Sequence, residues 1–471
     1  MQGIKQDDDM TTQRDSDTPN EFGSNKSNAQ GESHLLIRLF LAAMAQRKEA
    51  PFDITKAGYG GKPLEGDDLQ QQLAKIVDRW HCMTGLQDLC AVINMALQAM
   101  YGMEAKKITP VRLKRLAQHS RYVTFEIPKK KKGEFRSIDA PCSRLRNVQR
   151  ALNFVLQMVY TPHKAAMGFV KEKSVATNAH VHLGQNFVYN IDLKDFFHTI
   201  VSGRVYNRLL SKPFCLNDKV ASLITDLCCY TKSDPKSNEF FEKNSKKVLP
   251  QGAPTSPSIT NIICERLDYK LTRLAKAYGL KYTRYADDIT FSGPNNVFAS
   301  DGKFCSSLRN IIENEEGFKI NTDKTRLSHR GMRQEVTGLT VNTKANVSRK
   351  YIKQLRPLIH NWEVKGYDEA QAIFVKHYAA TNTRNLAYKG EHHIENVISG
   401  KLLYLKMVKG DDDATYLKLK KRFDCLMENL AQAPTTKTAS ENIQPTYTST
   451  STSLDVRLQR LFESNFDLSV L

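Results

Sequence analysis

Two adjacent acids inside a strand-like run, Asp287 and Asp288, constrain the fold of this chain more than any other feature. They lie in Lys281-Tyr-Thr-Arg-Tyr-Ala-Asp-Asp-Ile-Thr-Phe-Ser-Gly293. The β-branched and aromatic residues around them predict two short strands joined by a tight turn, with the carboxylates at its tip. Neighbouring side chains on a strand point to opposite faces, so at most one of the two acids enters a given site easily. A metal site here needs another carboxylate; otherwise the acids form a polar turn, where Asp is common.

A third acid ends a different strand-like run, Phe187-Val-Tyr-Asn-Ile-Asp192. An acid at the end of an otherwise apolar strand is costly unless it binds a cation or a donor. Asp192 is therefore the candidate for the missing carboxylate. A strand-end Asp and a hairpin Asp can hold two Mg²⁺ ions ~3.5–4 Å apart, which clamps the attacking and leaving oxygens of an in-line transfer.

Charge and cysteine content narrow the class of protein. The chain carries +19, and residues 1–34 hold seven acids and three bases, so residues 35–471 carry about +23. Such a body predicts a polyanionic partner, most often nucleic acid, although a basic soluble protein is the alternative. Nine cysteines without a C-x-x-C pair predict free thiols in a reducing cytoplasm. The polar first 30 residues predict no secretory signal, and no apolar run reaches the ~20 residues of a membrane span.

Two further motifs carry features that suit phosphate and nucleotide. Tyr122–Pro128 and Ser137–Pro141 alternate like the strands of a hairpin, and Lys129–Arg136 forms its basic tip. That tip suits triphosphate or backbone phosphate, unless it is only a solvated charged turn. In Leu249-Pro-Gln-Gly-Ala-Pro-Thr-Ser-Pro257, glycine lets the backbone approach a ligand closely, and Ser-Pro predicts the N-cap and first turn of a helix.

Composition divides the remainder of the chain. The composition of residues 1–34 predicts a disordered acidic tail. Residues 35–107 are predicted to form a helical N-terminal extension that either supports the body or binds a partner. Residues 231–247 are polar and predict a surface loop or insertion. Helical patterns continue over 346–432, followed by a Thr/Ser-rich linker at 433–453 and an amphipathic helix at 454–471.

In their order along the chain, these motifs resemble those of reverse transcriptases over roughly residues 108–430. The matching motifs are the basic hairpin, Asp192, Gln251-Gly-x-x-x-Ser-Pro257, Tyr285-Ala-Asp-Asp288 and Gly317 to Lys324. The resemblance implies an α+β right-hand polymerase with a helical N-terminal extension. Its fingers and antiparallel palm sheet would occupy residues 108–345, and its helical thumb residues 346–432.

Two motifs resemble those of bacterial retron reverse transcriptases: Asn178-Ala-His-Val-His182, and Val336-Thr-Gly338. That subgroup implies a cognate structured noncoding RNA, a small DNA product linked to it, deoxynucleotide substrates, and defence against phage with a separate effector protein. A group II intron or other bacterial reverse transcriptase is the nearest alternative, and a catalytically silent RNA-binding scaffold is another. The chain departs from the subgroup in the polar stretch at 231–247, in four lysines at the hairpin tip and in its long end extensions.

The resemblance also implies roles at the metal site. Asp192 and Asp287 would each hold both Mg²⁺ ions, Asp288 would be a weaker ligand, and the carbonyl of Leu193 would touch the nucleotide-bound ion. Lys324 would donate a proton to pyrophosphate, although phosphate binding alone also explains it.

Further residues would bind nucleotide and RNA. Lys129 and Arg136, facing each other across the hairpin, would grip the β and γ phosphates. Phe197 would exclude a ribose 2′-OH or be a core aromatic, and Gln251 and Gly252 would lie against the template base and incoming nucleotide. The remaining residues are assigned to RNA: Asn178 and His182, which share a helical face and are otherwise structural, and Arg349 and Lys350 at the start of the basic thumb.

Overall fold

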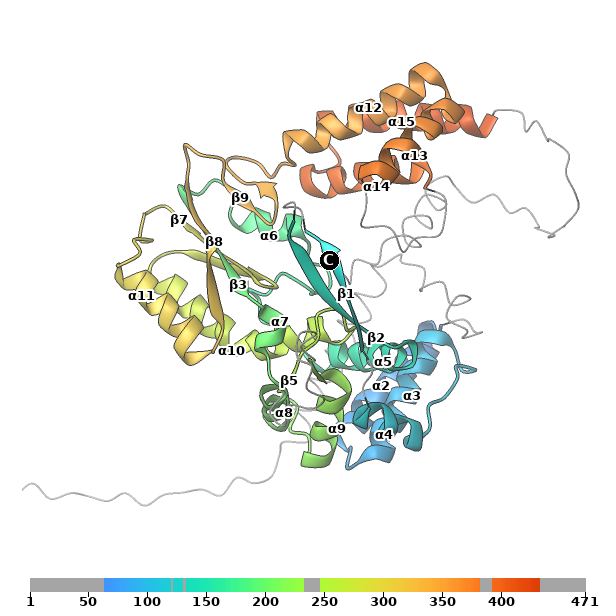
Figure 1. Cartoon of the computed structure of the whole chain (residues 1–471), viewed down its shortest axis with the longest axis vertical. Helices are drawn as coiled ribbons and strands as arrows, with labels where there is room; N and C mark the ends of the chain where they lie inside the picture. Colours follow the sequence, from blue (N-terminus) through green and yellow to red (C-terminus); the bar gives the residue numbers. More distant parts are fainter. Residues whose placement is uncertain (1–62, 120–121, 130–132, 233–245, 382–391, 433–471) are drawn as a thin grey trace, which may run out of the picture.

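The computed structural model describes residues 63–119, 122–129, 133–232, 246–381 and 392–432, and Figure 1 shows their arrangement. The predicted tail at 1–34, most of the extension before residue 63, the linker at 433–453 and the helix at 454–471 lie outside the described residues. Within those residues helices and strands are mixed, as expected of an α+β protein.

The N-terminal helices are part of the main body. They are α2 (Gly66–His81), α3 (Leu86–Tyr101) and α4 (Pro110–Gln118). Thr109 caps α4, because its side chain accepts a hydrogen bond from the Arg112 backbone N–H at 3.4 Å. Apolar side chains of these helices, such as Trp80 and Ile93, share one core with helices that follow the basic hairpin. The described part of the extension therefore supports the body, which was one of the two predicted roles.

The basic hairpin consists of β1 (Tyr122–Pro128) and β2 (Phe135–Pro141), followed by helix α5 (Ser143–Val159). Pro128 pairs with Phe135, and Arg136 pairs with Ile127. The prediction that Lys129 and Arg136 face each other is corrected, because the Lys129 backbone N–H instead donates to the Glu134 carbonyl at 2.8 Å. The strand register places the two cations diagonally on one face of the hairpin.

An antiparallel four-stranded sheet forms the centre of the palm, in the order β6-β7-β3-β8. Its strands are β3 (Phe187–Lys194), β6 (Lys281–Tyr285), β7 (Asp288–Gly293) and β8 (Lys319–His329). Buried Ile191, Ile289 and Phe291 face helix α10 (Ser256–Ala277), α11 (Lys303–Arg309) and the π-helical turn η2 (Asn310–Glu315) in the main core. Apolar and polar residues alternate along β7, but polar Thr290 and Ser292 are buried as well, because α6 (Val175–Val181) lies against the other face and His182 at its end contacts Ser292.

Short helices and strands complete the fingers and palm. They are α6 (Val175–Val181), α7 (Phe196–Thr199), α8 (Ser202–Leu210), α9 (Asp218–Cys228), β4 (Tyr230–Thr231), β5 (Lys247–Val248), β9 (Glu335–Val336) and β10 (Leu339–Thr340). The polar stretch predicted at 231–247 begins and ends in a strand pair, because Thr231 pairs with Lys247. Thr337 and Gly338 of the Val336-Thr-Gly338 motif form a turn between β9 and β10, with φ of 46° and 82°.

Within the described residues, four helices form the thumb: α12 (Arg349–Lys365), α13 (Tyr367–Thr381), α14 (Ile394–Lys409) and α15 (Ala414–Gln432). In Figure 1 they gather at the end of the molecule opposite the N-terminal helices, with the sheet between. Their buried side chains, including Leu355, Ile398 and Phe423, form a second core that also contains Ala179 of α6 and Val336 of β9. Both motifs of the retron resemblance thus contribute to the base of the thumb.

Two general predictions are tested by the described part of the chain. All nine cysteines are free thiols, as expected. Among the described residues, no helix combines the length and the apolar character needed to cross a bilayer.

Candidate active site

Strand pairing brings the three predicted carboxylates to one end of the palm sheet. Asp192 near the end of β3 is the direct partner of Asp288 at the start of β7. The backbone N–H of Leu193 donates to the carbonyl of Asp287 at 3.0 Å. Asp287 lies in the two-residue turn between β6 and β7, since Tyr285 pairs with Asp288. The predicted hairpin with acids at its tip is therefore confirmed.

The turn is held in a conformation that an L-residue rarely adopts. Ala286 has φ of 55°, in the left-handed region, which costs a non-glycine residue roughly 1–2 kcal/mol. The segment before α6 packs closely against this turn, since a Cβ added to Gly168 would lie 2.6 Å from the Ala286 backbone nitrogen. The Met167 backbone N–H also donates to the Arg284 carbonyl at 2.7 Å. The surrounding chain thus determines where Asp287 lies.

The buried cation Arg284 also supports the turn that carries Asp287. Arg284, fully buried, donates through Nη1 to the Ala286 carbonyl at 3.2 Å and through Nη2 to Asn261 Oδ1 at 3.1 Å. Its Nε and Nη2 also lie 2.8 and 2.7 Å from the carboxylate oxygens of Asp268 on α10. The sequence analysis did not single out either residue. The signal that could have found them is an ionisable residue in a strand position that alternation assigns to the interior.

The carboxylates strongly influence one another. Burial from water and the charge of Asp192 raise the pKa of Asp287. Asp288 reaches solvent at the edge of the turn, but the surrounding protein removes part of its hydration. Together with the charges of Asp287 and Asp192, that desolvation raises the pKa of Asp288 to about 7. Closely placed acids of this kind favour a bound cation.

Lys324 supplies a cation to this cluster. Its Nζ lies 2.9 and 3.0 Å from the two carboxylate oxygens of Asp192, and Asn321 Nδ2 donates to the same carboxylate at 3.0 Å. Burial alone would lower the pKa of Lys324, but the hydrogen bond and charge of Asp192 raise it overall. Lys324 therefore lies beside the carboxylates, and its role toward pyrophosphate stays a prediction.

The three carboxylates are the type of ligand that a hard divalent cation prefers. Asp192, Asp287 and Asp288 offer carboxylate oxygens, which Mg²⁺ prefers, and their mutually raised pKa values are what a cation would relieve. Over the ranges that the structure covers, no three His, Cys, Asp or Glu side chains already converge as a metal cage. Lys324 Nζ instead contacts both carboxylate oxygens of Asp192.

The buried acid Asp139 holds Gln251, one of the residues predicted to bind nucleotide. The backbone N–H of Asp139 on β2 donates to the Gln251 carbonyl at 2.7 Å, and the Asp139 carboxylate accepts from the Gln251 backbone N–H at 3.2 Å. His198 Nε2 contacts the same carboxylate at 2.9 Å. Burial alone would raise the pKa of Asp139, but hydrogen bonds from His198 and Thr124 help to lower it to about 2. Asp139 and His198 are residues that sequence reasoning missed.

Gly252 approaches protein rather than open space. Its φ is 127°, and a Cβ there would lie 2.9 Å from Ile138 Cγ2. The close backbone approach predicted for this glycine is present, but toward strand β2. The N-cap predicted at Ser256 is corrected, because α10 already includes Ser256 and its hydroxyl donates to the Pro250 carbonyl at 2.6 Å.

The remaining nucleotide residues border the cluster. Phe197 is half-buried and lies edge-on to buried Phe196, with ring centroids 5.5 Å apart. Arg136 is exposed, and its charge acts on Asp287. Lys129 forms an exposed ion pair with Glu134 at 3.7 Å. Arg136 thus lies close enough to the cluster for its charge to act on Asp287, and the assignment of Lys129 and Arg136 to nucleotide phosphates stays a prediction.

Asn178 and His182 lie inside the protein. Thr283 Oγ1 donates to Asn178 Oδ1 at 2.6 Å, and His182 contacts Thr283 Oγ1 at 2.8 Å and Ser292 Oγ at 2.7 Å. His182 is fully buried, and Asn178 is 1% exposed. Direct RNA contact is therefore corrected for this conformation. The structural alternative applies: the shared helical face ties α6 to β6 and β7.

Arg349 and Lys350, the last predicted RNA residues, begin α12 and are exposed. Ser348 caps the same helix, accepting from the Tyr351 backbone N–H at 3.3 Å. Both cations are thus presented on an ordered helix end rather than on a loop, and neither lies among the carboxylates.

Comparison with known proteins agrees with this geometry. Residues 127–366 match the family model described as "Reverse transcriptase (RNA-dependent DNA polymerase)". The Retron Mx65 and Retron Mx162 reverse transcriptases of Myxococcus xanthus are 39% and 38% identical over 242 and 260 residues. Each match covers 51% of this chain, and 55% and 52% of those proteins, so the chain spans about half their length. The Retron Ec86 reverse transcriptase of Escherichia coli is 35% identical over 248 residues, covering 51% of this chain and 70% of that protein.

The family match covers 240 residues, more than half of the 471-residue chain. It includes every carboxylate of the cluster, as well as Lys324 and the Gln251 motif. With the relatives just described, these findings show that the chain belongs to the reverse transcriptase family and, within it, to the bacterial retron reverse transcriptases.

Proposed function

We propose that this chain is an RNA-directed DNA polymerase that copies part of a cognate structured noncoding RNA into a small single-stranded DNA that stays linked to that RNA. The observation that carries the proposal is the pairing of Asp192 with Asp288, beside Asp287 in the turn. Family membership supports the same chemistry.

The metal-binding roles follow from the carboxylates. Asp192 and Asp287 would hold two Mg²⁺ ions, with Asp288 and the carbonyl of Leu193 as further ligands. When bound, the ions lower the pKa of the attacking hydroxyl and neutralise the triphosphate. Lys324 holds a proton on Nζ, because Asp192 raises its pKa. It can give that proton to the departing pyrophosphate or bind phosphate as a cation.

The fingers and palm would orient the nucleotide. Lys129 and Arg136 would grip its phosphates through charge-assisted hydrogen bonds. Gln251 and Gly252 would lie against the template base and incoming nucleotide, held in place by Asp139. Phe197 would exclude a ribose 2′-OH and so favour deoxynucleotides.

Partners and context belong to the same proposal. The basic thumb, beginning with Arg349 and Lys350, would track the duplex backbone and recognise an RNA hairpin by shape. Synthesis would start from the 2′-OH of an internal guanosine of that RNA. The system would act in the cytoplasm in defence against phage, together with a separate effector protein. Nine free thiols are consistent with a reducing compartment.

The decisive experiment expresses the gene with its native flanking DNA and examines the nucleic acid that copurifies with the protein. Wild type is compared with Asp287→Ala and with Asp301→Ala, which removes an exposed acid outside the cluster. We expect a short DNA joined to a structured RNA in the wild type and the control, and its loss in Asp287→Ala.

Other outcomes decide against the proposal. RNA without linked DNA in all three samples, together with extension of a DNA primer on an RNA template, would favour an intron-type enzyme. RNA binding without metal-dependent extension of any primer would favour the silent scaffold. Absence of bound nucleic acid in every sample would contradict the proposal as a whole.

A further inference from the structure

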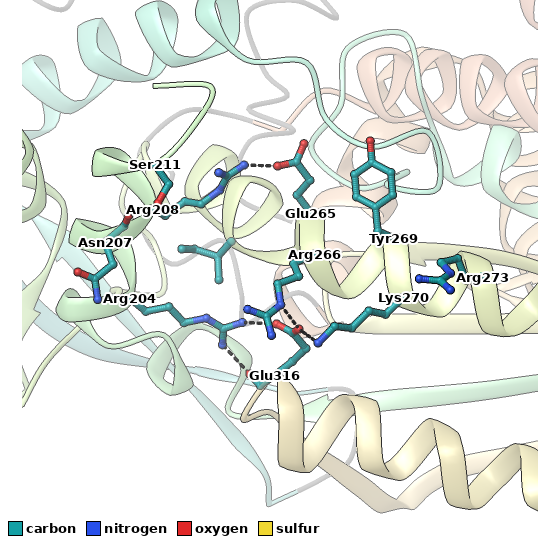
Figure 2. Close-up of a pocket in the computed structure, with 11 residues that line it drawn as sticks. Arg204, Asn207, Arg208, Ser211, Glu265, Arg266, Tyr269, Lys270, Arg273 and Glu316 are labelled. Atoms are coloured by element: carbon teal, nitrogen blue, oxygen red, sulfur yellow. Dashed lines mark hydrogen bonds and ion pairs between the residues drawn. The ribbon is translucent and has the colours of Figure 1, made fainter. Parts of the chain in front are cut away.

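A pocket of about 470 Å³ opens on the palm between α8 and α10, and none of the catalytic carboxylates line it (Figure 2). Two of its lining residues are acids, Glu265 and Glu316. Five are basic: Arg204, Arg208, Arg266, Lys270 and Arg273. The pocket thus carries an excess of positive charge, and its use depends on which cations are already neutralised.

Glu316 is the internal anchor of the pocket. Its side chain is 4% exposed and accepts from Arg204 at 3.3 Å, Arg266 at 3.0 Å and Lys270 at 2.6 Å. Arg204 also donates to the Glu316 carbonyl at 2.7 Å and lies 4.6 Å above the Phe318 ring. These contacts join α8 and α10 to the chain that enters β8, so Arg204 is committed to the fold.

Arg208 is committed as well. It donates to the carboxylate of Glu265 and to the carbonyls of Lys212 and Ile262. All of its nitrogens are therefore engaged within the protein. These three bonds hold the guanidinium in place on the protein.

Arg266 and Arg273 retain donors for a ligand. The Arg266 side chain is 71% exposed, and its ion pair with Glu316 engages Nε, which leaves the two terminal nitrogens facing solvent. Arg273 is exposed and has no ion pair or hydrogen bond with any residue in the described ranges. No dashed line reaches Arg273 in Figure 2.

An exposed aromatic residue lies between these two cations. Tyr269 is 58% exposed, with one edge against His163 at a ring separation of 4.7 Å. Arg266, Tyr269 and Arg273 are spaced i, i+3 and i+7 on α10, so their backbone positions lie on one side of the helix over about 10 Å, although the Arg266 and Tyr269 side chains extend in different directions in Figure 2.

We propose that this face of α10 binds unpaired RNA, with phosphates on Arg266 and Arg273 and a base stacked on Tyr269. Aromatic platforms flanked by cations bind single-stranded nucleic acid in this way, without sequence preference. The inference rests on the proposed function, since the ligand is a segment of the noncoding RNA held outside the site that copies it.

The first test measures affinity for a labelled single-stranded RNA of about 16 nucleotides, the upper site size of such surfaces. Arg266→Glu with Arg273→Glu should weaken binding about tenfold or more and reduce the salt dependence by about two phosphate contacts. Tyr269→Ala should weaken it about tenfold, whereas Tyr269→Phe, which keeps the stacking ring, should bind like wild type.

A charge-matched control separates a local site from general attraction. Lys114→Glu with Arg115→Glu changes two exposed cations on α4 by the same amount. An equal loss of affinity in this control would overturn the inference. So would unchanged affinity in the α10 variants, or photocrosslinking of thiouridine-containing RNA that never reaches the peptide bearing Tyr269.

Primer extension distinguishes this inference from the proposed function. All the surface variants should extend a DNA primer on an RNA template at the wild-type rate, and Asp287→Ala should not. If the wild type fails to extend, the polymerase proposal fails. If extension is normal but the α10 variants bind RNA like wild type, only the α10 surface is wrong.

Discussion

Arg284 and Asp268 form a fully buried, bidentate ion pair directly beneath the turn that carries Asp287. Nε lies 2.8 Å from one carboxylate oxygen and Nη2 lies 2.7 Å from the other, with neither side chain exposed. The same guanidinium donates to the carbonyl of Ala286, whose left-handed backbone sets the turn. Because desolvation offsets much of the attraction in such a pair, we attribute its importance to the geometry that it imposes on the turn.

Arg284→Met should lower the free energy of unfolding by about 3–5 kcal/mol, because it leaves the Asp268 carboxylate buried without its cation. Urea unfolding measures this loss. Adding Asp268→Leu should recover part of it, since an apolar pair of similar volume needs no desolvation, while the buried Tyr282 hydroxyl loses its acceptor.

Catalysis should not recover in that double variant, because nothing then donates to the Ala286 carbonyl. We expect a reduced kcat with little change in KM for the nucleotide, measured at a temperature where both proteins are folded. A double variant with the wild-type kcat would show that the ion pair serves stability alone.

Local patterns were enough to predict most of the elements that carry the site. Alternation predicted the hairpin around Asp287 and the strand that ends near Asp192, because strand periodicity is written in neighbouring residues. The pairing of Asp192 with Asp288 required the register between strands about 100 residues apart, which the sequence alone did not contain. The resemblance to reverse transcriptases supplied that missing link.

The errors share one physical cause. A four-residue spacing correctly placed Asn178 and His182 on one helical face, but it does not say whether that face meets solvent or Thr283. Similarly, Ser256 has the chemistry of an N-cap, yet its hydroxyl donates to the carbonyl of Pro250 instead. In both cases the local sequence allowed more than one hydrogen-bond partner, and contacts with distant parts of the chain determined which partner is used.

The buried histidine predicts a pH dependence of stability. Burial, and to a lesser extent the charge of Lys281, lowers the pKa of His182 from 6.5 to about 3. Below pH 6.5 the unfolded chain binds a proton that the native protein does not, so stability falls as the pH falls. This group alone should cost about 2 kcal/mol at pH 5 relative to neutral pH.

His182→Gln removes the titrating group and retains polar atoms for Thr283 and Ser292. Its unfolding free energy should therefore fall less steeply than that of wild type between pH 6.5 and pH 5, by up to about 1.4 kcal/mol per pH unit. Unfolding by urea at several pH values measures both slopes. Identical slopes would show that His182 is not a buried neutral histidine.

Gly168→Ala should damage catalysis through the backbone. The added Cβ would meet the Ala286 backbone nitrogen at 2.6 Å, so the turn or the opposing segment must move. Since displacements of about 1 Å cost roughly a hundredfold in rate, we expect a loss of that order in kcat. Gly203→Ala on α8 is the control, because nothing lies within 4 Å of its added Cβ. That control should keep full activity, with a gain of up to about 1 kcal/mol in stability; equal activity in the two variants would contradict the packing argument.

Phe197→Ala should allow ribonucleotides into the site. The ring is half-buried against Phe196 and lies just after the strand that carries Asp192, so its removal opens space beside the sugar. We expect the preference for deoxynucleotides, expressed as a ratio of kcat/KM values, to fall about tenfold or more. Phe196→Leu is the matched control, because this neighbouring ring is 3% exposed and belongs to the core. It should lose stability without changing the ratio. Discrimination that is the same in Phe197→Ala as in wild type would leave Phe197 as a core aromatic, and the choice of sugar would then depend on other residues.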